Sequence, residues 1–375
     1  MTVTSFSGLE GVVAAETHLS CVDGERGSLL LHGYPVEELA PAATFEETAW
    51  LFWHGRRPNA AEREALRAEL AGLRTLPEAV LALLREAARE EIPAMDALRM
   101  AAAGLTLGCV DGDVNREAKR ATAAFPVIVA AYQRLRAGQE VIEPREDLGH
   151  AANFLYMLSG DEPDAARVRA LETYLNTVVD HGLNASTFTA RVIISTGSDL
   201  ISAVVGAVGA LKGPLHGGAP GPALQTVFDI GTAENARPFL RAKLERGERL
   251  MGFGHRVYRV RDPRAEVLSE AAQRLATSGR NRELYELATH VERVALELLA
   301  EFKPDRRLNT NVEYYTALLL HGLDFHQDVF SSIFAMARVV GWCAHSMEQI
   351  AVGRLIRPKG RYVGTKRAWD VASEA

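Results

Sequence analysis

The stretch NAAEREALRAELAGL, residues 59–73, indicates the fold class of this chain. Asn59 and Glu62 have the spacing of a capping box, in which two side chains accept hydrogen bonds from free backbone N–H groups at a helix start. Apolar residues then recur at helical spacing, namely Leu66, Leu70 and Leu73. We therefore predict an amphipathic helix that begins at Asn59 and buries its leucines.

The same helical period recurs along most of the chain after residue 45. Near residue 290 it ends before Pro304 and is carried by four apolar residues, Val291, Val294, Leu298 and Phe302. The first fifty residues differ, because residues 18–22 and 28–32 flank a glycine-containing turn, a pattern typical of two short strands. Strand-like runs do not alternate with helices, and no segment repeats at a fixed period. The predicted fold class is all-α with a short N-terminal β-hairpin.

Length and composition bound the possible functions. At about 150 residues per domain, the 375 residues suggest two domains. Hydrophobic residues make up 47% and charged residues 24%, which is ordinary for a globular chain with a large packed core. The net charge of −6, without a basic stripe, argues against nucleic acid as a partner.

The cysteines and the apolar runs bear on location. Cys21, Cys109 and Cys343 are scattered without CxxC spacing, which argues against a disulfide framework or a zinc ribbon and favours a reducing compartment. No basic segment followed by an apolar one opens the chain, so no signal peptide is expected. The longest apolar run, Leu200 to Leu211, is shorter than the about 20 residues of a membrane span. We therefore expect a cytoplasmic protein without a membrane partner.

Two segments rich in turn residues interrupt the helical pattern. Residues 138–147 (GQEVIEPRED) are polar and contain a proline, as expected of a surface connection. Residues 212–222 (KGPLHGGAPGP) contain four glycines and three prolines, so they are not expected to continue a helix. This second segment either joins two domains or wraps a ligand, and a histidine lies at its centre.

Three histidines, His181, His216 and His255, lie in unusual surroundings. Their segments read DHGLNASTFT, GPLHGGA and MGFGHRVY. Glycines flank two of them, which lets the backbone approach a ligand closely and leaves N–H groups free to point at it. Arg264 follows in Asp-Pro-Arg, where the proline fixes a turn. These features indicate a binding or catalytic site and leave its chemistry open.

Other site chemistries lack their usual spacing. The i, i+3 or i, i+4 pairs of helical zinc sites are absent around the three histidines. His345 and Glu348 have i, i+3 spacing, but no second copy accompanies them, which argues against a di-iron bundle. The common phosphate-binding and hydrolase motifs GxGxxG, GxxxxGK[ST] and GxSxG are missing. No metal and no tightly bound cofactor is expected.

Taken together, these motifs resemble the short bacterial type of the citrate synthase family. The resemblance spans almost the whole chain, with its segments in family order. Besides the histidine motifs it includes GLEGV (8–12), FEET (45–48), PREDLGHAANFLY (144–156), NVEYY (311–315), RVVGWCAH (338–345) and RPKGRYVG (357–364).

The resemblance implies a homodimer whose subunits have an all-α, two-domain fold enclosing an active site. By this analogy the large domain comprises residues 1–217 and 323–375, and the small domain, residues 218–322, is inserted between them. The segment 212–222 would then be the hinge. The predicted N-terminal hairpin fits the short β element that these enzymes often have.

The resemblance also implies a reaction, the condensation of acetyl-CoA with oxaloacetate and water to give citrate and CoA. This reaction needs a carboxylate to take a proton from a weakly acidic methyl group and a donor to stabilise the enolate. By analogy Glu313 is the base, His216 donates to the thioester oxygen, and His255 polarises the oxaloacetate carbonyl.

Binding roles are implied in the same way. The two carboxylates of oxaloacetate need forked donors, which Arg264, Arg338 and Arg357 would supply together with His181. The analogy brings Arg357 in from the other subunit. The co-substrate acetyl-CoA is expected at four further residues, Arg259 and Lys359 at its phosphates and Gly252 and Gly254 near its adenine.

Two positions depart from the usual family pattern. Glu313 replaces an aspartate, which lengthens the arm of the base by about 1.5 Å, and a misplacement of about 1 Å can slow a reaction about 10²-fold. Pro220 replaces an asparagine. Some bacterial members that resemble secondary citrate synthases carry the same pair. Either the backbone compensates for the longer side chain or the enzyme is slow.

Three alternatives stay open at this point. A 2-methylcitrate synthase uses propionyl-CoA on the same scaffold, and one methylene is worth only about 1–3 kcal/mol of discrimination. A non-catalytic paralogue that binds CoA or dicarboxylates would tolerate Glu313, although the intact histidines and arginines argue against it. A purely structural protein is disfavoured because glycine-rich segments destabilise helices without any structural return.

Overall fold

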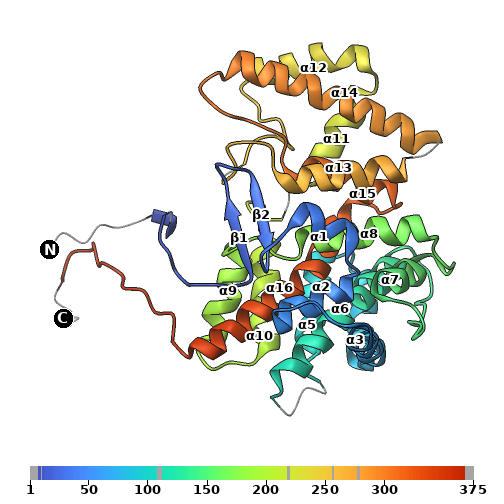
Figure 1. Ribbon diagram of the computed structural model, residues 1–375, viewed down its shortest axis with the longest axis vertical. Helices are drawn as coiled ribbons and strands as arrows, with labels where there is room; N and C mark the ends of the chain where they lie inside the picture. The colour runs from blue at the N-terminus through green and yellow to red at the C-terminus, as the bar shows by residue number, and fades with distance from the viewer. Residues whose placement is uncertain are drawn as a thin grey trace, which may run out of the picture.

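The computed structural model describes residues 7–9, 11–107, 112–217, 220–255, 257–276 and 279–367. Within these ranges the regular structure comprises sixteen α-helices, two short 3-10 helices and one three-stranded sheet. Figure 1 shows the sheet beside a helical body, with the N-terminal segment leading into it. The predicted fold class, all-α with a short N-terminal hairpin, is confirmed.

The helices are, in chain order, α1 (Val36–Ala42), α2 (Phe45–His54), α3 (Ala60–Gly72), α4 (Glu78–Arg89), α5 (Ala94–Gly104), α6 (Val114–Arg136), α7 (His150–Ser159), α8 (Ala165–Val178), α9 (Ala185–Ile194), α10 (Leu200–Leu211), α11 (Pro220–Ile230), α12 (Ala233–Glu245), α13 (Pro263–Leu275), α14 (Gly279–Phe302), α15 (Val312–Gly322) and α16 (Phe330–Val352). The 3-10 helices are Ser7–Leu9 and Gln327–Val329.

Local sequence signals set several of these boundaries. Asn59 caps α3 through the predicted capping box, in which its side chain and that of Glu62 each accept the other's backbone N–H at 2.9 Å. Helix α14 ends at Phe302, before Pro304, as predicted. Residues 138–147 form the predicted connection between α6 and α7.

The second predicted break is shorter than expected. Helix α10 ends at Leu211, but α11 already begins at Pro220, so the last prolines of the segment open a helix and do not belong to a linker. The reason is that proline loses no hydrogen bond in the first helical turn and its fixed φ suits a helix. Residues 218 and 219, including the predicted start of the small domain, lie outside the described residues.

The N-terminal hairpin is present and carries a third strand. Strands β1 (Ser20–Asp23) and β2 (Ser28–Leu31) pair antiparallel, and β3 (Tyr34–Pro35) pairs with β2. The hairpin turn fits closely against residues 257–260, because a Cβ on Gly24 would lie 2.3 Å from the backbone oxygen of Val257. The turn therefore supports a loop that follows His255.

The core is centred on α16, which is buried along most of its length. Its Trp342 is fully buried, and α16 packs against α6, α8, α9 and α10. Helices α11, α12 and α14 lie together at the upper end of the molecule in Figure 1, with α13 and α15 between them and the body. Helix α13 packs both on α15 and on α1 and α8.

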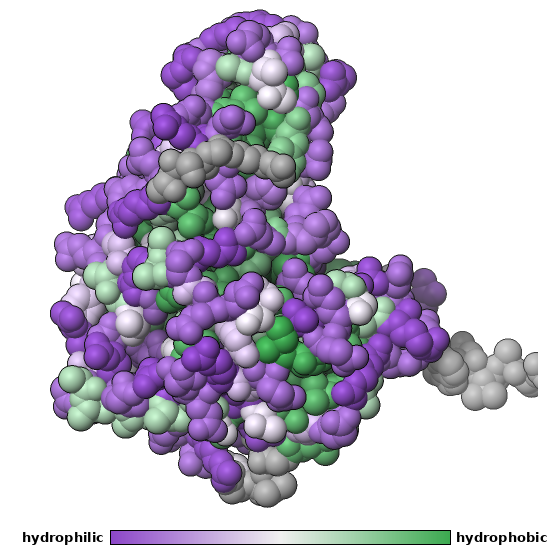
Figure 2. Space-filling view, turned by 90° about the vertical axis from the view of Figure 1, so that its right-hand side faces the viewer, coloured by the Kyte–Doolittle hydropathy of each residue, from purple (hydrophilic) through white to green (hydrophobic). Residues whose placement is uncertain are grey.

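The surface and the helix lengths complete the picture. Figure 2 shows hydrophilic residues over most of one face, with hydrophobic residues visible between them. No helix in the described ranges is long and apolar enough to cross a membrane. Helix α10, the apolar run noted in the sequence, has 12 residues. Cys21 and Cys343 are free thiols, and Cys109 lies outside the described residues.

Candidate active site

The loop before His255 is bound to the start of α15. The backbone N–H of Gly254 donates to Asn309 O at 2.7 Å, and the N–H of Asn311 donates to Gly252 O at 2.9 Å. Gly252 has a φ of +88°, and a Cβ there would lie 2.7 Å from the Tyr314 ring, so only glycine fits this approach. Two segments about 55 residues apart are thereby held side by side.

Asn311 connects the base candidate to this loop. Its Oδ1 accepts the backbone N–H of Glu313 at 3.0 Å and so caps α15, while its Nδ2 donates to Gly254 O at 2.8 Å. One side chain thus fixes the first turn of α15 relative to the glycine loop. Glu313 and His255 therefore lie on two segments that Asn311 joins.

His255 is a neutral hydrogen-bond donor. The backbone N–H groups of Val257 and Tyr258 both donate to its Nδ1, at 3.0 Å each, which leaves the ring proton on Nε2. Burial lowers the pKa of His255 to about 4, and the Arg264 guanidinium acts in the same direction. At neutral pH this ring therefore offers an Nε2–H group without carrying a charge.

His181 lies next to His255. The two ring centroids are 5.7 Å apart, and Nε2 of His181 lies 3.1 Å from the Tyr258 hydroxyl. Burial, reinforced by Arg264 and Arg338, holds the pKa of His181 well below its usual value. The structure therefore brings two of the three predicted histidines together as neutral rings.

His216 has the opposite tautomer. Its Nε2 accepts the backbone N–H of Ser186 at 3.3 Å and lies 2.8 Å from the Ser186 hydroxyl, which leaves the proton on Nδ1. Trp342 holds this serine by donating its indole N–H to Oγ at 3.1 Å. Burial, with a further effect of Arg338, lowers the pKa of His216 to about 4.

Two buried arginines supply positive charge. Arg264 forms a two-pronged ion pair with Asp262, at 3.0 and 2.7 Å. Arg338 donates its Nε–H to Val178 O at 2.8 Å and stacks over Phe334. Burial lowers the pKa of Arg338 to about 10, so it remains charged at neutral pH. No carboxylate among the described residues pairs with Arg338, which leaves its charge available to an anion.

Glu313 is a carboxyl with a raised pKa. Burial raises its pKa to about 7, an effect that Arg264 opposes and Asp262 supports. Its side chain is partly exposed. A base whose pKa lies near the working pH is well suited to general base catalysis. Chemically, a carboxyl with a raised pKa, two neutral histidines of opposite tautomer and two buried arginines could deprotonate a carbon acid beside a bound anion.

The remaining predicted residues lie elsewhere. Arg357 and Lys359 are exposed in the extended segment after α16, which runs away from the body in Figure 1 and is fixed by Ile356 N donating to Ser195 Oγ at 3.1 Å. Arg259 is exposed in the loop that contacts the hairpin turn. Arg357 and Lys359 do not contact the histidines of the same chain, whereas Arg259 directly follows Tyr258, whose ring lies 4.8 Å from that of His255.

Several side chains that shape the site were missed by sequence reasoning, namely Ser186, Tyr258, Asp262 and Trp342. All lie within or beside the motifs quoted from the sequence. Their effects depend on contacts between distant segments, as between Trp342 and Ser186, so spacing alone did not reveal them.

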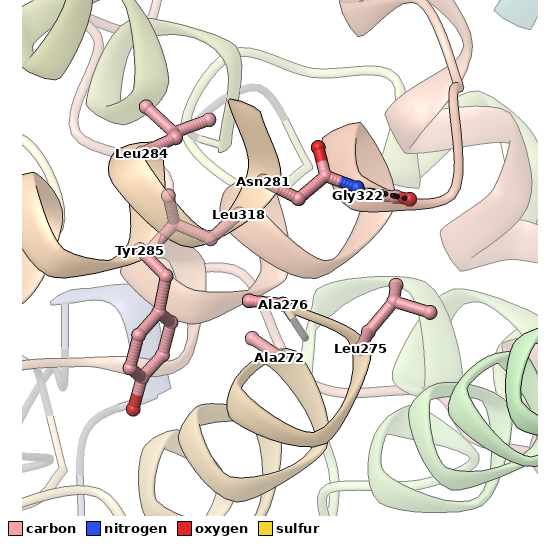
Figure 3. Close-up of a pocket in the computed structure, with 8 residues that line it drawn as sticks. All are labelled: Ala272, Leu275, Ala276, Asn281, Leu284, Tyr285, Leu318 and Gly322. Carbon is pink, nitrogen blue, oxygen red and sulfur yellow. Dashed lines mark hydrogen bonds between the residues drawn. The ribbon is translucent and has the colours of Figure 1, made fainter. Parts of the chain in front are cut away.

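An apolar pocket lies apart from the candidate site residues. Figure 3 shows a pocket between α13, α14 and α15, where Tyr285 and Leu318 lie on opposite helices and Asn281 donates to Gly322 O at 3.3 Å. Its lining contains none of the predicted site residues. Among the described residues, no group of three or more His, Cys, Asp or Glu side chains is placed to hold a metal ion.

Comparisons with known proteins identify the family of the chain. The family model "Citrate synthase, C-terminal domain" matches residues 8–359. The chain is 41% identical over 370 residues to citrate synthase 2 of Bacillus subtilis (strain 168), with 96% of each chain covered. It is 40% identical over 364 residues to the 2-methylcitrate synthase of Mycobacterium tuberculosis (strain H37Rv), covering 95% of this chain and 90% of that protein.

A solved structure is similar over almost the full length. It is the ternary complex of carboxymethyl coenzyme A and oxaloacetate with citrate synthase from Thermoplasma acidophilum, with a TM-score of 0.89, 29% identity and 98% of each chain covered. The chain belongs to the citrate synthase family.

Proposed function

We propose that this protein condenses acetyl-CoA with oxaloacetate and water to give citrate and CoA. The observation that carries the proposal is the pair of opposite tautomers of His216 and His255. The ring proton is on Nδ1 in His216 and on Nε2 in His255. A reaction that joins an enolate to a ketone needs one donor at each oxygen.

In the first step Glu313 removes a proton from the methyl group of acetyl-CoA. The electron pair moves toward the thioester oxygen, where His216 donates its Nδ1–H to the enolate that forms. Because burial keeps His216 neutral, with a pKa of about 4, it hydrogen-bonds to this oxygen as an uncharged donor and keeps its proton. Asn311 fixes Glu313 at the start of α15, which provides the positioning that the longer side chain requires.

In the second step the enolate carbon attacks the ketone of oxaloacetate. His255 donates its Nε2–H to the ketone oxygen as negative charge develops there. Arg264, Arg338 and His181 bind the carboxylates of oxaloacetate, and water then hydrolyses the citryl thioester to release citrate and CoA. No tightly bound cofactor has a role in this scheme.

The assembly that we propose is a homodimer in which Arg357 of the partner subunit completes each site. Two features support it: Arg357 lies away from the histidines of its own chain, and the same segment exposes apolar side chains. Leu355, Tyr362 and Val363 are 58%, 79% and 91% exposed, a pattern that favours burial against another surface. The free thiols of Cys21 and Cys343 support a reducing, cytoplasmic location.

We further propose that residues 218–322 form the small domain and that acetyl-CoA binds between it and the rest of the chain. Arg259 and Lys359 would meet its phosphates, and the Gly252 and Gly254 backbone its adenine. Closure on ligands would be visible as a smaller radius of gyration in small-angle scattering with oxaloacetate and a CoA analogue. An unchanged radius at saturation would contradict closure.

A thiol-release assay tests the reaction and its acyl preference together. Oxaloacetate with acetyl-CoA should release free CoA at a higher kcat/KM than oxaloacetate with propionyl-CoA. A reversed preference would favour the alternative of a 2-methylcitrate synthase, which is the name of the Mycobacterium tuberculosis relative. Binding of both substrates without thiol release would instead indicate a non-catalytic paralogue.

A further inference from the structure

One face of α16 contacts the three residues that precede His181, namely Val178, Val179 and Asp180. The Nε–H of Arg338 donates to Val178 O at 2.8 Å. One helical turn further along α16, a Cβ on Gly341 would lie 2.5 Å from Val179 O. The absence of a side chain at Gly341 therefore lets the backbone of Val179 pack directly against α16. These positions and residue 345, at i, i+3 and i+7, share one helix face.

The contact at the end of this face joins two buried groups. Nε2 of His345 lies 3.2 Å from the Asp180 carboxylate, and both side chains are fully buried. The same carboxylate accepts hydrogen bonds from the Ser20 hydroxyl and, at 3.3 Å, from the backbone N–H of Gly182. Asp180 directly precedes His181 in the chain, and its carboxylate accepts the backbone N–H of Gly182, which directly follows His181. The backbone is therefore fixed on both sides of His181.

Further polar groups fix the ring of His345. Nη1 of Arg191 lies 3.1 Å from Nδ1 of His345, and because arginine only donates, the ring proton is on Nε2, facing Asp180. Arg191 is in turn held by Glu348 at 2.6 Å and by Gln349 at 3.1 Å. Each side chain in this buried hydrogen-bond network is thus oriented by its neighbour in the network.

We propose that His345 is a positioning residue for oxaloacetate binding. It orients the Asp180 carboxylate, which with Ser20 fixes the turn that presents the His181 ring to the substrate. His345 itself touches no substrate. The inference rests on the proposed function, because it takes His181 as a ligand of oxaloacetate. The pair His345 and Glu348, which has the spacing of a metal site in the sequence, thereby has a structural explanation that involves no metal.

The test compares two substitutions of His345. His345→Leu removes the donor, and His345→Gln retains an N–H near the position of Nε2. Oxaloacetate affinity, measured by calorimetry, should fall about tenfold or more in His345→Leu, the loss typical of an unpaired hydrogen bond to a charged group. Affinity should recover in His345→Gln, and the KM for acetyl-CoA should change little in either variant.

His150→Leu is the matched control. His150 is equally buried, and its ring makes no hydrogen bond to the described residues. The His150→Leu variant therefore loses the same kind of ring at a position that has no link to His181. If His345→Leu folds and binds oxaloacetate as the wild type does, or loses no more affinity than His150→Leu, the inference is wrong.

Ser20→Ala decides the question if His345→Leu does not fold. It removes the hydroxyl that accepts Gly182 N–H at 2.9 Å and donates to Asp180, at a partly exposed position in β1. Oxaloacetate affinity should fall several-fold, and an unchanged affinity would overturn the inference. A wild-type protein that binds no oxaloacetate would refute the proposed function itself, which separates the two failures.

Discussion

Glu313→Gln should make the ligand-free protein more stable in alkaline solution, although it removes the proposed catalytic base. Burial raises the pKa of this carboxyl to about 7 in the fold, from the 4.5 of an ordinary glutamate. Below pH 4.5 the carboxyl is protonated in both states and costs nothing. As pH rises to 7 the unfolded chain loses the proton first, so the free energy of unfolding falls.

The size of the effect follows from the two pKa values. A difference of about 2.5 units at about 1.36 kcal/mol per unit gives about 3 kcal/mol as an upper bound. Because the side chain is partly exposed, solvent screening reduces this to about 1–2 kcal/mol. Glutamine does not ionise, so the variant should exceed the wild type by that amount at pH 8 and by little at pH 5.

Urea unfolding of the ligand-free protein at both pH values measures the difference. Glu283→Gln, on the exposed face of α14, is the control and should alter stability little at either pH. If Glu313→Gln is no more stable than the wild type at pH 8, the carboxyl is not held in a desolvated site, and the reason given for its raised pKa fails.

Three further outcomes are expected. The kcat/KM should rise with pH through about 7 as Glu313 ionises, whereas His216 and His255, with pKa values of about 4, stay neutral; a flat profile from pH 5.5 to 9 would be inconsistent with this. His216→Ala should lower kcat by about 10²–10³-fold, as loss of an oxyanion donor does, with an unchanged circular dichroism spectrum; turnover close to wild type would exclude its role. Mixed dimers of Arg357→Ala and Glu313→Gln chains should regain activity, because one of their two sites has both residues intact. No recovery after verified subunit exchange would refute the shared site.

The fold was largely predictable because its signals are local. The capping box at Asn59 and the glycine turn between β1 and β2 each act within a few residues. Strand β3 was missed since two residues, one of them proline, show no alternation. The start of α11 was missed because proline both ends helices and opens them, and only the surrounding structure decides which.

The sequence predicted the residues of the candidate site, but it did not predict their hydrogen bonds. The histidine motifs could be recognised from sequence, but the tautomers of His216 and His255 are set by Ser186 and by two backbone N–H groups that only the fold places there. Likewise, the contact between Asp180 and His345 joins residues 165 positions apart. No spacing rule relates such pairs.

Turnover of Glu313→Gln with acetyl-CoA and oxaloacetate, set beside the wild type at pH 8, tests the central claim most directly. An amide cannot accept the methyl proton at this pH, so the loss should be about 10²–10⁴-fold, the usual contribution of general acid–base catalysis. Unfolding cannot account for such a loss if the variant is the more stable protein. Turnover equal to the wild type would mean that another group removes the proton and that Glu313 is not the base.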